Sequence, residues 1–197
     1  MSSLYSLGNP VASIATLLAW ISFCTVMLRS RRPPSKEKTG VAKRDSSSIF
    51  GIALQGLGIG LCWTGPARFD FPPTPATWIA AIVPAAIALL SASLFIWSTQ
   101  TMGANWSLVA RTREDHSLVQ SGPFALMRNP IYVALFGMML AIAVSLGHAI
   151  NLVVALPLFL VGTLARVHIE EKLLRATFGA AYDDYAHRVK RFIPMIW

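Results

Sequence analysis

The stretch GANWSLVARTREDHSLVQSGPFALMRNPIY, residues 103–132, is the longest polar segment that lies between strongly apolar ones in this chain of 197 residues. It gathers most of the residue types that chemistry uses, including His116, Arg128 and Tyr132. The residues before it have the character of a membrane anchor. The residues after it predict two further spans and a polar tail. We therefore expect the fold to be organised around this segment.

The composition argues against an ordinary soluble domain. Hydrophobic residues make up 54% of the chain and charged residues only 13%, whereas soluble domains carry about 25% charged residues. Several apolar runs approach the roughly 20 residues that a helix needs to cross about 30 Å of hydrocarbon. The sequence therefore predicts an all-α fold, a multi-span helical membrane protein.

Five apolar runs predict about five transmembrane helices, at residues 9–28, 49–64, 78–97, 131–147 and 151–165. The last two are short and closely spaced, which predicts a helical hairpin. The second run is rich in glycine, which would let a neighbouring helix approach closely. Its Gln55 is expected to make an interhelical hydrogen bond rather than to act in catalysis.

The positive charges lie in alternate loops. Of the 17 Lys and Arg residues, seven fall in residues 29–48, three in residues 98–130 and six in the tail from Arg166, which places sixteen on one side of a five-span protein. This bias marks cytoplasmic loops, so the net charge of +8 is not interpreted as a nucleic-acid-binding face. It predicts an outside N-terminus and a cytoplasmic C-terminus, with residues 103–132 also facing the cytoplasm. Residues 1–100 would hold three spans, and residues 101–197 a core with the hairpin and an amphipathic tail.

Motifs of several enzyme classes are missing from the sequence, including a phosphate-binding loop, a dinucleotide fingerprint, a zinc HExxH motif and a nucleophile elbow. Cys24 and Cys62 both fall inside apolar runs. They are expected to be small buried residues, so neither a disulfide framework nor a metal site is predicted.

Arg166 and Glu170 lie four residues apart, so on a helix they share a face. Two interpretations stay open from spacing alone. The pair is either an interfacial ion pair with a snorkelling arginine, or an anion-binding arginine held in place by glutamate. The pair Asn129-Pro130 predicts a helix start, with the asparagine side chain capping the helix and proline in the first turn.

Together these segments resemble a known family. The segment HSLVQSGPFALMRNPIYVALFG, residues 116–137, resembles the core motif of isoprenylcysteine carboxyl methyltransferases and their bacterial relatives. The tail RVHIEEKLLRATFGAAYDDYAHRVKRFIP, residues 166–194, is similar to the second signature of that family, and MGANWS fits the phrase that precedes the core. The resemblance covers about residues 103–194, nearly half of the chain.

The resemblance implies S-adenosylmethionine as the methyl donor, held without a Rossmann domain at the cytoplasmic face of the membrane. It places the substrate-side pair on Arg166 and Glu170. It places the cofactor contacts on His116, Ser117, Leu118, Val119, Phe124, Asn129, Pro130, Ile131 and Tyr132. This chain departs from the family in having Phe124 where tyrosine is usual and Asn129 where histidine is usual, so no imidazole is available there.

The implied activity is transfer of a methyl group to a lipophilic acceptor in a multi-pass protein of the bacterial inner membrane. The favoured acceptor is the carboxylate of an isoprenylcysteine-like or lipidated substrate, reached from the membrane lipid; no nucleic-acid partner and no oligomeric state are predicted. One alternative is a phospholipid N-methyltransferase or a small-thiol S-methyltransferase. Others are a non-catalytic heme- or lipid-binding protein on the same scaffold, and an NADPH-dependent reductase.

Overall fold

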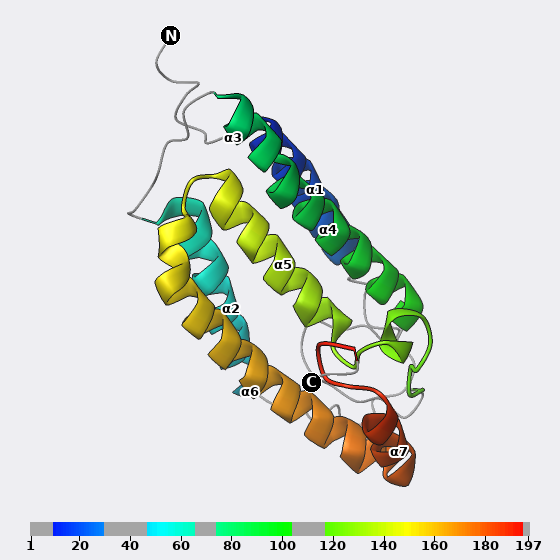
Figure 1. Ribbon diagram of the computed structural model, residues 1–197. Coiled ribbons are helices and arrows are strands. Elements are labelled where there is room, and N and C mark those ends of the chain that lie inside the picture. Colours follow the sequence, from blue (N-terminus) through cyan, green and yellow to red (C-terminus); the bar gives the residue numbers. More distant parts are fainter. Residues whose placement is uncertain (1–9, 30–46, 66–73, 104–116, 195–197) are drawn as a thin grey trace.

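The computed structural model describes residues 10–29, 47–65, 74–103 and 117–194, and helices dominate them (Figure 1). The prediction of an all-α fold is confirmed. The described part of the chain adds only one isolated bridge, between Met127 and Lys190. In chain order the elements are α1 (Pro10–Arg29), α2 (Ser47–Thr64), α3 (Pro75–Ala80), α4 (Ile82–Met102), η3 (Gly122–Ala125), α5 (Pro130–Ser145), η4 (Ala149–Asn151), α6 (Leu152–Phe178) and α7 (Ala180–Arg188).

Helix α5 lies between two helix pairs, α1 with α4 on one side and α2 with α6 on the other (Figure 1). The sequence of α5 explains this position, because the helix carries buried apolar or small side chains on several of its faces. The buried core runs along α5 and joins both pairs through Phe95 of α4, Met138 and Ile142 of α5, and Phe159 of α6. Residues 117–129, α7 and residues 189–194, which we call the C-terminal segment, gather at one end of the bundle (Figure 1).

Two helical stretches are long and apolar enough to cross a bilayer, Pro75–Met102 and Ala149–Phe178, with mean hydropathies of 2.4 and 2.0. Three further apolar helices, Ala12–Leu28, Ile49–Thr64 and Pro130–Ser145, are shorter. At 1.5 Å per residue they extend about 25 Å, somewhat less than the hydrocarbon thickness. Many large apolar side chains face outward, which suits a surface in contact with lipid. The number of spans and their orientation stay predictions.

Helix α6 is longer than the sequence pattern predicts. The last span was expected to end near residue 165, but the helix continues through Arg166 and Glu170 to Phe178. No helix breaker interrupts this charged region, which is rich in good helix formers. The helix ends at Gly179, whose φ of +52° is one that glycine adopts at little cost. The candidate pair therefore lies within this helix, as its four-residue spacing predicts.

The packing of α2 against α6 depends on glycine. A Cβ on Gly162 would lie 2.7 Å from the carbonyl oxygen of Gly51, and a Cβ on Gly58 would lie 2.9 Å from that of Ala155. The close approach expected of the glycine-rich run is thus confirmed, and α6 packs chiefly on α2 rather than on α5, its expected hairpin partner. The interhelical hydrogen bond of Gln55 is also confirmed, since its Nε2 donates to Thr163 Oγ1 at 2.8 Å.

Replacement of Gly162 by valine should separate α2 from α6. We expect Gly162→Val to lower the free energy of unfolding by about 1–3 kcal/mol, the usual cost of overpacking, and to lower the thermal unfolding midpoint in detergent. Gly60→Val is the matched control, because a Cβ at Gly60 meets nothing within 4 Å. Equal loss of stability in both variants would contradict this account of the α2–α6 contact.

Candidate functional site

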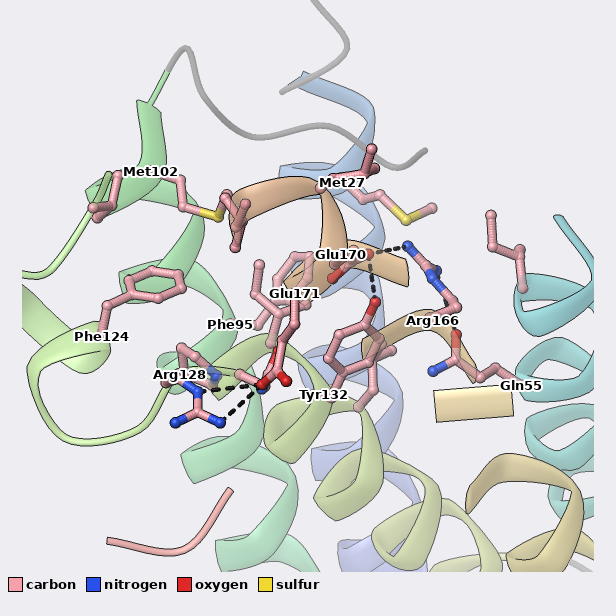
Figure 2. Close-up of a pocket in the computed structure, with 18 of the residues that line it drawn as sticks. Met27, Gln55, Phe95, Met102, Phe124, Arg128, Tyr132, Arg166, Glu170 and Glu171 are labelled. Carbon is pink, nitrogen blue, oxygen red and sulfur yellow. Dashed lines mark hydrogen bonds and ion pairs between the residues drawn. The ribbon is translucent and has the colours of Figure 1, made fainter. Parts of the chain in front are cut away.

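A cavity of about 430 Å³ opens among α1, α2, α4, α5, α6, α7 and residues 117–129 (Figure 2). Ligand sites commonly occupy roughly 300–1,000 Å³. The cavity brings together ten of the predicted site residues, whereas His116 lies outside the described residues. The ten are Ser117, Leu118, Val119, Phe124, Asn129, Pro130, Ile131, Tyr132, Arg166 and Glu170. Their individual roles stay predictions.

Three of these residues form one hydrogen-bonded group in the cavity wall (Figure 2). Arg166 Nη2 donates to Glu170 Oε1 at 3.2 Å, and the Tyr132 hydroxyl donates to the same oxygen at 2.7 Å. The Arg166 guanidinium also lies over the Tyr132 ring, 5.4 Å from its centroid. The shared helix face predicted from the four-residue spacing is therefore observed. The Arg166 side chain is only 8% exposed and that of Glu170 28%, so this is not a solvated surface pair.

Gln55 holds the same arginine from the opposite helix. Its Oε1 accepts a hydrogen bond from Arg166 Nη1 at 3.3 Å, while its Nε2 donates to Thr163. The amide therefore fixes the guanidinium relative to α2 as well as α6. Sequence reasoning found the interhelical role of Gln55 but missed its contact with Arg166. The signal in the sequence for such a contact was the position of Gln55, a glutamine within an otherwise apolar run.

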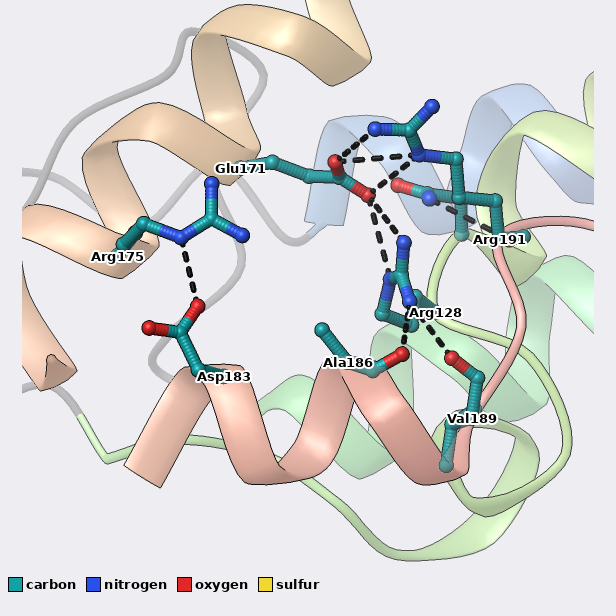
Figure 3. A network of polar contacts seen from close by, with 8 residues as sticks. Arg128, Glu171, Arg175, Asp183, Ala186, Val189 and Arg191 are labelled. Carbon is teal, nitrogen blue, oxygen red and sulfur yellow. Dashed lines mark hydrogen bonds and ion pairs between the residues drawn. The ribbon is translucent and has the colours of Figure 1, made fainter. Parts of the chain in front are cut away.

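A second polar network ties the end of the bundle together, and its centre is Glu171 (Figure 3). The buried carboxylate accepts from Arg128 Nη2 at 2.9 Å and from Arg191 Nη2 at 2.7 Å. Arg128 Nη1 also donates to the carbonyl oxygens of Ala186 and Val189, both at 2.7 Å. One ion-pair cluster thus joins the segment before α5, the end of α6 and the end of α7.

The C-terminal segment runs alongside the start of α5. Backbone N–H groups of Arg128 and Asn129 donate to the carbonyl oxygens of Lys190 and Arg191, at 2.8 and 3.0 Å. Asn129 does stand at the N-cap position with Pro130 after it, but its side chain does not cap the helix as expected. Its Nδ2 instead donates to the Arg191 carbonyl oxygen at 3.3 Å, because this neighbouring strand-like segment lies within reach.

Two tyrosines of α7 close the same end of the cavity. The Tyr185 hydroxyl donates to the Phe124 carbonyl oxygen at 2.7 Å, and Tyr182 is fully buried beside it. Burial raises the pKa of Tyr182 to about 12 and also raises the pKa of Tyr185. Both phenols therefore stay neutral at physiological pH and serve as aromatic wall. The site residues predicted from the sequence included neither these two tyrosines nor Arg128 and Glu171. All four belong to the segments that resemble the family.

The cavity combines two kinds of surface. One is charged, with Arg166, Glu170 and Glu171, and the other is aromatic, with side chains that include Phe124 and Tyr132. Aromatic faces attract organic cations, and a buried arginine with a fixed orientation attracts a carboxylate. The arrangement can therefore hold a cationic ligand and an anionic ligand next to each other.

Comparison with known proteins gives consistent matches. The family model described as phospholipid methyltransferase matches residues 79–181, more than half of the chain and every predicted site residue. A cobalt-zinc-cadmium resistance protein of Cupriavidus metallidurans is 30% identical over 134 residues, which cover 67% of this chain and 56% of that protein. The protein-S-isoprenylcysteine O-methyltransferase of Saccharomyces cerevisiae is 26% identical over 123 residues, 61% of this chain and 52% of that enzyme. The enzyme of the same name from Schizosaccharomyces pombe is 32% identical over 90 residues, 45% and 38% of the two chains. The matched region spans about half the length of the first of these relatives.

Loss of the Glu171 carboxylate charge should loosen the C-terminal segment. We expect Glu171→Gln to lower the free energy of unfolding by about 3 kcal/mol, because it leaves Arg128, whose side chain is only 11% exposed, without its counter-charge. The change should also speed tryptic cleavage after Lys190 and Arg191. The control is Asp183→Asn, which breaks the ion pair with Arg175. The side chains of Asp183 and Arg175 are 46% and 56% exposed. That change should cost no more than about 1 kcal/mol. Similar stability and cleavage rates in the two variants would contradict the role given to Glu171.

Proposed function

We propose that this chain, which belongs to the phospholipid methyltransferase family, is a membrane-embedded methyltransferase that uses S-adenosylmethionine and methylates a lipophilic acceptor. The favoured acceptor group is a carboxylate, as in an isoprenylcysteine. Two of the matching relatives carry the name protein-S-isoprenylcysteine O-methyltransferase. The observation that carries the proposal is the buried group of Arg166, Glu170 and Tyr132 at the wall of one partly aromatic, partly apolar cavity.

The cavity would hold the methyl donor in the part that is lined by residues of the segment 117–132. Its size is in the range of small-molecule sites, and its aromatic side chains would surround a sulfonium cation. Residues 117–119, Phe124 and residues 129–132 would hold the donor there. When bound, S-adenosylmethionine supplies an electrophilic methyl group. Asn129, in place of the usual histidine, offers a hydrogen-bond donor but no group that titrates near neutral pH.

Arg166 would bind and orient the acceptor carboxylate. Its guanidinium is buried and is held on two sides, by Glu170 from α6 and by Gln55 from α2. A donor group fixed before the acceptor arrives costs little reorganisation during reaction. Apolar side chains such as Phe95 and Leu135 also line the cavity. In such surroundings the attraction between Arg166 and an anion would be stronger than in bulk solvent.

Glu170 would hold Arg166 rather than accept a proton. Its Oε1 already receives hydrogen bonds from both Arg166 and Tyr132. A carboxylate acceptor has no proton to lose, so it needs no general base. An amine or thiol acceptor would require a group within hydrogen-bond reach to take its proton. The second carboxylate oxygen of Glu170 could still take a proton, so the two hydrogen bonds at Oε1 do not choose among a carboxylate, an amine and a thiol acceptor. The names of the two relatives favour the carboxylate.

The metal-resistance name of one relative adds no second function here. Within the described residues, no three His, Cys, Asp or Glu side chains gather as they would to hold a metal ion. The similarity to that relative supports the shared scaffold and nothing more specific.

The test is methyl transfer from radiolabelled S-adenosylmethionine to N-acetyl-S-farnesylcysteine, measured on the full chain in detergent or nanodiscs. We expect transfer by the wild type and a loss of about 100-fold or more in kcat/KM for Arg166→Lys, which keeps the charge but loses the planar fork. Glu170→Gln should also lose activity, because it weakens the hold on Arg166.

Lys172→Gln is the matched control, since Lys172 is an exposed basic residue of the same helix that does not line the cavity. It should leave kcat/KM unchanged. Wild-type turnover by Arg166→Lys would overturn the proposed role of Arg166. No transfer to the farnesyl acceptor, with transfer to a phospholipid amine, would overturn the choice of acceptor.

A further inference from the structure

Part of the cavity lining is apolar and comes from α1 and α2; we call this part the apolar arm. The α1 side presents Trp20, Cys24 and Met27, and the α2 side presents Ile52, Gly56 and Ile59. None of these side chains is charged. Helix α1 packs chiefly on α4 and α5, and α2 packs chiefly on α6 and α5. Trp20 of α1 and Trp63 of α2 meet with ring centroids 5.9 Å apart, and the cavity opens beside this contact. An apolar chain fits this arm better than a polar one.

The four glycines of α2 divide into two kinds. Gly51 and Gly58 are required by packing, because a Cβ at either would meet a backbone oxygen of α6 at 2.9 Å. A Cβ at Gly56 or at Gly60 would meet nothing within 4 Å. Of this second pair, Gly56 lines the cavity and Gly60 does not.

The open space at Gly56 calls for another explanation than helix packing. Glycine inside a helix is less favourable than alanine by about 1 kcal/mol, and the backbone of α2 at this position is ordinary helix. What the missing side chain provides is room on the cavity side of α2. From Ile52 to Ile59 the arm extends about 10 Å along the helix, at 1.5 Å per residue.

The inner end of the arm meets the candidate reaction site. Gln55 precedes Gly56 in the chain and accepts the hydrogen bond from Arg166. Because Gln55, Gly56 and Arg166 all line the same cavity, an acceptor whose carboxylate lies at Arg166 could direct its apolar chain past Gly56. Gly56 is exposed as well as lining the cavity, so a longer chain could continue past it.

We propose that Gly56 is a specificity-determining residue, whose missing side chain lets long or branched apolar acceptor chains occupy the arm between α1 and α2. This inference rests on the proposed function. It adds the residue that selects acceptors by the bulk of their chain, separately from the group that binds their carboxylate.

The experiment compares Gly56→Leu with Gly60→Leu on N-acetylcysteine acceptors that carry S-butyl or S-farnesyl chains. We expect Gly56→Leu to lower kcat/KM for the farnesyl acceptor by about tenfold or more, the effect of crowding a filled site, and to change the value for the butyl acceptor less than about twofold. Gly60→Leu should change neither. Binding of S-adenosylmethionine should be the same in all three proteins.

A binding readout that needs no turnover uses Cys24 in the arm. The farnesyl acceptor should slow alkylation of Cys24 by N-ethylmaleimide in the wild type, and this protection should be lost in Gly56→Leu. Cys62 has no exposed surface in the described structure and serves as the unreactive internal reference.

Equal use of the farnesyl acceptor by wild type and Gly56→Leu, or equal loss for both acceptors together with loss of donor binding, would overturn the inference while leaving the proposed function in place. Absence of methyl transfer by the wild type would instead defeat the proposed function. In that case, protection of Cys24 in the wild type but not in Gly56→Leu would still support the role of Gly56 in admitting apolar chains, and its absence would reject it.

Discussion

The buried guanidinium of Arg166 is the constraint on which the rest of the structure depends. A charge in an apolar bundle is costly unless its hydrogen bonds and a counter-charge are supplied. Here Glu170 supplies the charge, Gln55 supplies an acceptor from α2, and Tyr132 from α5 bonds to the same carboxylate. Three helices are thus held around one polar group, and the cavity is the space that they leave beside it.

Glycine sets where α2 can approach and where it leaves room. At Gly51 and Gly58 the helix contacts α6 so closely that the Gln55 amide reaches both Thr163 and Arg166. One position away from Gln55, the absent side chain of Gly56 leaves space on the cavity side. The same helix therefore fixes the arginine and leaves the apolar arm open. The Glu171 network has a different role, because it joins Arg191 of the C-terminal segment to Arg128, which lies just before α5.

Local spacing carried the sequence predictions that the structure bears out. The helical turn from Arg166 to Glu170 and the interhelical bond of Gln55 follow from neighbours along one helix or from an amide in an apolar run. The partners of Glu171 could not be read in this way, because they come from residues 128 and 191, distant along the chain. The side chain of Asn129 was misassigned for the same reason, since its acceptor, the carbonyl of Arg191, is supplied by the C-terminal segment. Which glycines pack and which face open space depends on the neighbouring helix, and the sequence does not contain that geometry.

The central claim is that the part of the cavity around the Tyr132 ring binds S-adenosylmethionine. Isothermal titration calorimetry of the purified full chain in detergent tests it most directly, with Tyr132→Ala and Tyr132→Phe beside the wild type. The account predicts binding by the wild type, similar binding by Tyr132→Phe, and an affinity lower by about tenfold or more when the ring is removed. Folded wild-type protein that gives no binding heat at millimolar donor, or a Tyr132→Ala variant that binds as tightly as the wild type, would contradict it.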